Sequence, residues 1–210
     1  MENALFLDAV RAGHLIGLAV GFGPAICADL LVAKSFFKPI EQRDVDLLKK
    51  LHLVVFGGLA LLWVTGLLLL QIRTGFEVSQ FTPKLMTKII LVIVLTGNAM
   101  AIGIYAMPRF DSHVGVMFGK IDPPTLINLT IIAGLSMSCW LSALALGAFS
   151  QLKPLSYESL QAVFVPVFTI GLTGAVLVGL LAVLIARARS GDDMLPGDTA
   201  RINTARINLV

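Results

Sequence analysis

The sequence predicts an all-α membrane protein, a polytopic bundle of about five transmembrane helices. Of its 210 residues, 57% are hydrophobic and only 14% are charged, and the mean hydropathy is +0.88. A soluble domain has about 45–50% apolar and about 25% charged residues. A helix that spans a bilayer needs about 20 apolar residues. Five stretches meet this requirement, at residues 5–33, 51–72, 89–108, 124–149 and 160–185.

These stretches define one transmembrane domain, residues 1–189, followed by a polar tail, residues 190–210. The N-terminal flank of the first stretch carries Glu2 and Asp8 instead of a basic cluster, so we expect it to persist as a helix and not to be cleaved as a signal peptide. The tail contains a short tandem repeat of Ala-Arg-Ile-Asn. We expect it to be a cytoplasmic extension.

The distribution of positive charge predicts the orientation in a bacterial inner membrane. Five spans place the chain ends on opposite sides, and eleven Lys and Arg residues then fall on one side and five on the other. Cytoplasmic loops carry the excess of Lys and Arg, which predicts an N-out, C-in arrangement. The smaller, outer set is Arg11, Arg73, Lys84, Lys88 and Lys153. The basic balance therefore indicates topology and gives no reason to expect a nucleic-acid partner.

Small residues predict that the helices pack closely. Gly13, Gly17, Gly21 and Ala25 recur every four residues in the first span, a small-xxx-small pattern that lets helix backbones approach each other. Gly57 and Gly58 in the second span allow a similar approach. We expect a tight bundle whose outer surface contacts the lipid bilayer, either as a homo-oligomer or as a subunit of a larger membrane complex.

Two ionisable residues lie inside predicted spans near the outer face. His14 is about 4–5 Å deeper than Arg11, and Lys88 about 6 Å deeper than Lys84, at the α-helical rise of about 1.5 Å per residue. Ionisable groups at such depths are costly and often mark function. If the two face each other across the first and third spans, they form a site.

Each of these residues has a functional and a structural interpretation. His14 is either a ligand to haem iron or copper or a histidine hydrogen-bonded across a helix interface. Lys88 is a counter-charge to a carboxylate such as a haem propionate, or a base, or it extends to the outer headgroups. Arg11, Lys84 and Lys88 together form a basic cluster that favours an anionic ligand. Asn98, at mid-span, binds either a ligand or a neighbouring helix.

Other polar and soft groups are less informative. We expect Asp29 to pair with Lys34 or to meet water, or, as a further possibility, to belong to a proton or cation path. His52 lies near the inner face, about 22 Å from the level of His14, so the two cannot clamp one haem and His52 is predicted to be solvated. Soft ligands that Cu(I) accepts are scattered through the spans: Cys27, Met100, Met137 and Cys139. The sequence has no nucleotide-binding, zinc-protease or nucleophile-elbow motif flanked by the helices or strands that such a motif requires.

The first three spans resemble those of the CopD-like membrane superfamily, which includes copper-resistance CopD domains and HemJ-type protoporphyrinogen oxidases. The resemblance rests on Gly-His-Leu-Ile-Gly from residue 13, on Trp-Val-Thr-Gly from residue 63, and on Leu-Met-Thr-Lys-Ile-Ile-Leu-Val from residue 85. In HemJ-type proteins the first-helix histidine and the third-helix lysine form the functional pair, proposed to hold haem. The resemblance implies these roles for His14 and Lys88.

Three hypotheses follow from the sequence. The first is binding of haem b or a related porphyrin near the outer leaflet in a redox or porphyrin-handling role, with His14 as ligand and Lys88, Arg11 and Asn98 as polar partners. The second is copper transport or resistance. The third is a non-catalytic structural or assembly subunit of a larger membrane complex.

Overall fold

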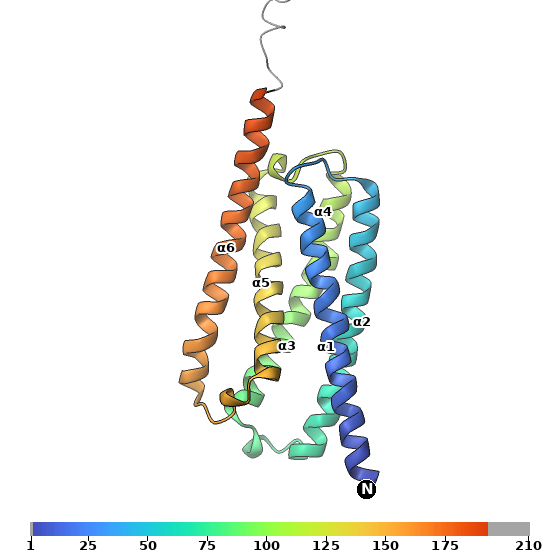
Figure 1. The fold of residues 1–210 in the computed structure, drawn as a ribbon, viewed down its shortest axis with the longest axis vertical. Coiled ribbons are helices and arrows are strands. Elements are labelled where there is room, and N and C mark those ends of the chain that lie inside the picture. The colour runs from blue at the N-terminus through green and yellow to red at the C-terminus, as the bar shows by residue number, and fades with distance from the viewer. Residues whose placement is uncertain (1, 193–210) are drawn as a thin grey trace, which may run out of the picture.

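The computed structural model describes residues 2–192, and these residues form an antiparallel bundle of long helices (Figure 1). The helices are α1 (Glu2–Lys34), α2 (Gln42–Thr74), α3 (Pro83–Ala101), α4 (Met107–Ser112), α5 (Pro123–Ala148) and α6 (Tyr157–Asp192). A π-helical segment, η2 (Ile102–Ala106), joins α3 to α4 without a break, so residues 83–112 form one span. Within the described range, five helical segments are thus long and apolar enough to cross a membrane. The predicted all-α membrane bundle is confirmed.

The helix ends follow from local sequence. Thr82 caps α3 by accepting a hydrogen bond from the backbone N–H of Leu85 (3.3 Å), and Asp122 caps α5 by accepting one from Thr125 (3.0 Å). Each helix then begins with proline, which has no N–H to leave unpaired. At the end of α2, Gly75 adopts φ 58°, a left-handed conformation that suits glycine.

Four of the five spans, all but α5, extend beyond the apolar stretches that predicted them. α2 begins at Gln42, so the charged segment before residue 51 is part of the helix. α6 continues to Asp192, past the predicted domain boundary at residue 189. The rest of the predicted tail, residues 193–210, lies outside the described residues.

The glycine stripe of α1 packs against α2, as predicted. A Cβ atom on Gly58 would lie 2.5 Å from the backbone N of Gly21, and one on Gly17 would lie 3.1 Å from the backbone N of Leu62. The indole ring of the fully buried Trp140 in α5 covers Gly21. Gly57 differs from its neighbour, because no atom lies within 4 Å of the place where its Cβ would be. The helix backbones are therefore closest at Gly21 and Gly58.

At the end of the bundle opposite the N-terminus, the α1–α2 loop pairs with the α4–α5 loop (Figure 1). The backbone N–H of Ile40 donates to Val116 O (3.0 Å), that of Gly115 donates to Ile40 O (2.8 Å), and that of Phe118 donates to Ser35 O (3.0 Å). Ile40 and Phe118 are each 2% exposed, so apolar packing reinforces this loop pair. Residues 109–123 thus close this end of the bundle.

Candidate functional site

His14 lies on the face of α1 that contacts α2. Its Nδ1 is 2.9 Å from Oγ1 of Thr65, a buried residue of α2. The next residue of α2, Gly66, leaves room for the ring, since a Cβ there would lie 3.5 Å from His14 Cε1. The imidazole is half-buried. A side chain from one helix thus positions the ring that the other helix carries.

This hydrogen bond assigns the tautomer of His14. The Thr65 hydroxyl donates to the backbone carbonyl of Leu61, four residues earlier, at 2.6 Å. Its only hydrogen is therefore used, and toward His14 its oxygen can only accept. Nδ1 of His14 must then carry the proton, which leaves the lone pair of the neutral ring on Nε2. Histidines that bind metals are commonly held in this way, with the second nitrogen donating to an oxygen atom.

Lys88 of α3 lies within electrostatic range of His14. Lys84, one turn earlier, and Arg73 at the end of α2 lie within similar range of Lys88. We call His14, Arg73, Lys84 and Lys88 the outer basic cluster, after the side of the membrane that the charge distribution predicts for it. Among the described residues none of its three cations is paired with a carboxylate, and the Lys84 ammonium donates to the carbonyl of Phe149 at 2.7 Å.

The other two predicted site residues have protein partners of their own. Arg11 forms an exposed ion pair with Asp8, at 2.9 Å, one turn away on the same helix. Asn98, which is 5% exposed, donates from Nδ2 to the carbonyl of Ile132 in α5 at 3.1 Å. Lys88 is thus within electrostatic range of His14, and Arg73, which the sequence did not single out, is a further cation near Lys88.

The outer basic cluster offers one free imidazole lone pair and several cations in a partly apolar setting. This donor set fits an anionic group that also carries a metal, such as haem, with one nitrogen for the iron and ammonium groups for the propionates. It does not by itself fit a bare metal ion held by protein ligands. Residues 2–192 contain no group of three or more His, Cys, Asp and Glu side chains placed to hold one.

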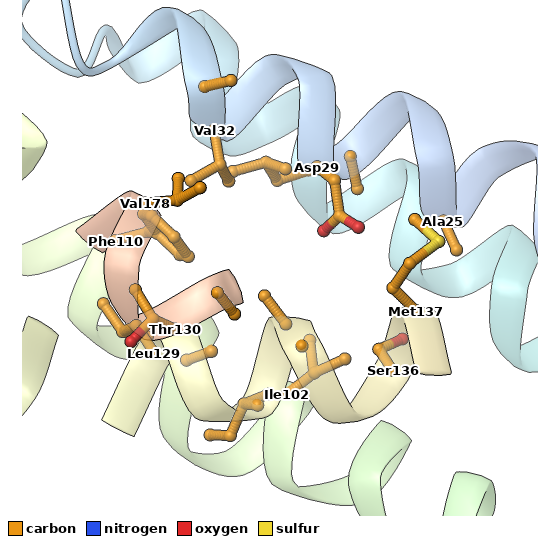
Figure 2. A pocket seen from close by; sticks show the side chains of 18 of the residues that line it. Ala25, Asp29, Val32, Ile102, Phe110, Leu129, Thr130, Ser136, Met137 and Val178 are labelled. Carbon is orange, nitrogen blue, oxygen red and sulfur yellow. The ribbon is translucent and has the colours of Figure 1, made fainter. Parts of the chain in front are cut away.

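A cavity of about 340 Å³ lies in the other half of the bundle (Figure 2). Asp29 of α1 directs its carboxylate into this cavity, and His52 of α2 lines it. The expected Asp29–Lys34 pair does not form, because Lys34 binds Asp44 at 2.8 Å and Glu41 at 3.5 Å. The sequence predicted a solvated His52. In the structure its ring is half-buried in the cavity wall, because η2 packs against it.

Sequence reasoning missed three contributors to these sites. Thr65 stood in the Thr-Gly pair of the second span, but its link to His14 depends on the antiparallel register of α1 and α2. That register could have been estimated from the glycines of the two spans. Arg73 was counted only for topology. Nothing in the sequence distinguished Gly103 from the other glycines, because its contact with His52 depends on the π-helical turn.

Comparisons with known proteins give no relative from which a function could be inferred. The chain matches no protein-family model, no curated protein and no solved structure. What the protein does must therefore be argued from its own residues.

Proposed function

We propose that this multi-pass membrane protein belongs to the CopD/HemJ-like type, resides in a bacterial inner membrane, and binds haem b or a related porphyrin at the outer end of its bundle. The observation that carries the proposal is the hydrogen bond from His14 Nδ1 to Thr65, which leaves Nε2 available to iron. Bound haem would supply one-electron redox chemistry. The residues of the chain would bind and orient it.

Each residue of the outer basic cluster has a distinct part in this proposal. Thr65 fixes the ring plane and tautomer of His14, so that the imidazole does not have to reorganise when it binds iron. Lys88 would attract the propionates as a compact, mobile charge, and Arg73 and Lys84 would add to the positive potential. The absence of a competing carboxylate among the described residues leaves these cations available to an anion.

Copper handling has weaker support. Cys27 is exposed on α1 and Met100 is 52% exposed on α3, whereas Cys139 is fully buried within α5. A path for Cu(I) needs soft ligands in succession along one route. A role as an assembly subunit has no observation of its own among the described residues.

The test is the optical spectrum of the full-length protein, purified after expression with haem supplied. We expect a Soret band and, on reduction, an α band. His14→Ala should abolish both bands. The matched variant His113→Ala should keep them, since His113 contacts Arg109 and Ser112 at the other end of the bundle. A wild-type protein without these bands, or an unchanged spectrum in His14→Ala, would refute the proposal.

A second variant separates ligation of iron from charge. Lys88→Met keeps a long side chain but removes the ammonium group. We expect it to weaken haem binding while the bands of the remaining complex keep their positions, since the iron ligand is unchanged. Lys120→Met, in the inner loop, is the matched control and should bind haem as the wild type does. A shift of the Soret band in Lys88→Met would assign the lysine to the iron itself.

A further inference from the structure

The cavity in the inner half of the bundle is apolar apart from a few groups. Its walls come from α1, α2, the η2–α4 segment, α5 and α6, and most of the lining side chains are aliphatic or aromatic. The hydroxyls of Thr130 and Ser136 border it (Figure 2). Of the residues that line it, only Asp29 and His52 can carry a charge. A volume of about 340 Å³ is within the range of small-molecule sites.

Asp29 has no cationic partner among the described residues. No ion pair or hydrogen bond of its carboxylate occurs there, and its oxygen atoms point into the cavity (Figure 2). Lys34, the nearest cation along α1, is held by the two carboxylates of Asp44 and Glu41. A carboxylate in apolar surroundings is costly unless something compensates it. A proton or a positive charge from outside the protein can supply this compensation.

His52 of α2 also lines the cavity and packs against Gly103. A Cβ on Gly103 would lie 3.2 Å from His52 Nε2, so the glycine leaves the ring its place. Gly103 lies in η2, and π-helical turns of this kind occur frequently at functional sites. No hydrogen bond of His52 occurs among the described residues. A neutral imidazole there can accept a hydrogen bond from a ligand N–H group.

The cavity reaches the outer surface of the bundle. Val178 of α6 lines it and is 46% exposed, and Figure 2 shows this residue beside Val32 of α1 at one end of the cavity. Because the outer surface of these helices contacts lipid, a ligand can enter from the membrane between α1 and α6. It must then have an apolar body as well as a charge.

We propose that this cavity binds a lipophilic organic cation, such as an amine or onium compound, with Asp29 as its counter-charge. The aliphatic walls take up the apolar body, and His52 accepts a hydrogen bond where the cation carries an N–H group. The cavity and the outer basic cluster lie in different halves of the bundle and share no residue. The inference therefore does not depend on haem binding.

Binding of methyltriphenylphosphonium to the full-length protein in phosphatidylcholine nanodiscs, measured by equilibrium dialysis, tests the proposal. Triphenylphosphine oxide is a neutral probe of nearly the same shape. We expect the cation to bind at least about tenfold more tightly than the neutral probe, because only the cation interacts with the carboxylate. Asp29→Asn should remove this difference by weakening the cation alone.

Three variants complete the design. Asp8→Asn, on the same helix but exposed and outside the cavity, should bind both probes as the wild type does. Val178→Trp should weaken both probes, because the larger ring closes the entrance. His14→Ala should leave both unchanged, which separates this site from the proposed haem site. Equal binding of the two probes by the wild type, or an unchanged preference for the cation in Asp29→Asn, would overturn the proposal.

The same measurement distinguishes two sources of the cation. Phosphatidylethanolamine carries a primary ammonium group at the membrane surface, whereas phosphatidylcholine has no N–H. If the natural occupant is a lipid headgroup amine, nanodiscs containing phosphatidylethanolamine should weaken phosphonium binding by competition. If it is a free organic cation, the lipid exchange should have no effect.

Discussion

Adding one methyl group at Gly58 should destabilise the bundle, whereas the same change at Gly57 should not. A Cβ at position 58 would lie 2.5 Å from Gly21 N and 2.8 Å from Gly21 Cα, whereas ordinary contacts are 3.4–4 Å. These are backbone atoms, so no side-chain rotation relieves the overlap. The two helices must separate by about 1 Å, and overpacking of this kind costs about 1–3 kcal/mol.

The expected effect can be measured as a change in melting temperature. For a chain of this size, 1 kcal/mol shifts Tm by about 2–4 °C, so Gly58→Ala should lower Tm by about 2–12 °C. Gly57→Ala meets nothing within 4 Å, and alanine is the better helix former by about 1 kcal/mol, so its Tm should stay the same or rise. Thermal unfolding in detergent, followed by tryptophan fluorescence, compares the two. Equal melting temperatures would refute the packing described here.

Three further predictions concern side-chain contacts. Thr65→Val keeps the shape of residue 65 but removes the acceptor for His14, so haem affinity should fall by about 10–100-fold. Thr65→Ser should restore the affinity. Equal affinities in spectral titrations would contradict the tautomer assignment. Lys34→Gln should lower Tm because it leaves the carboxylate of Asp44, which is only 6% exposed, without its ion-pair partner; an unchanged melting curve would show that the pair contributes nothing. The Thr125 N–H holds the pKa of the Asp122 carboxyl below its usual value. The cap therefore stabilises α5 fully at pH values above the unfolded pKa of about 3.9. This contribution is lost as the pH falls through the lower pKa of the folded state. Asp122→Asn lacks this dependence, and melting curves against pH should converge in acid.

The number of spanning helices could be predicted because it depends on a local property, whereas four of the five spans are longer than their apolar stretches. Apolar length determines which segments span a bilayer, and Thr82-Pro83 and Asp122-Pro123 mark helix starts wherever they occur. The spacing of the α1 glycines likewise predicted its contact face. The sequence did not distinguish Gly57 from Gly58, because the two differ only in which side of α2 they occupy.

The candidate site could be predicted only in part. His14 and Lys88 are conspicuous in the sequence because each is an ionisable residue in an apolar stretch. Their surroundings depend on the register and tilt of neighbouring helices, so the contact with Thr65 and the proximity of Arg73 emerged only from the fold. The cavity at Asp29 was missed for a similar reason. Its existence depends on how five spans diverge, which no single segment encodes.

The pairing of the α1–α2 loop with the α4–α5 loop constrains the order in which the protein can be completed during biosynthesis. The α1–α2 loop is synthesised before Gly115 and Phe118, so the backbone partners of Ile40 and Ser35 do not exist when that loop is made. A chain that stops before residue 115 therefore lacks the backbone partners of Ile40. Insertion of the third span brings the second loop to the same membrane face, and only then can the first loop become inaccessible to proteases.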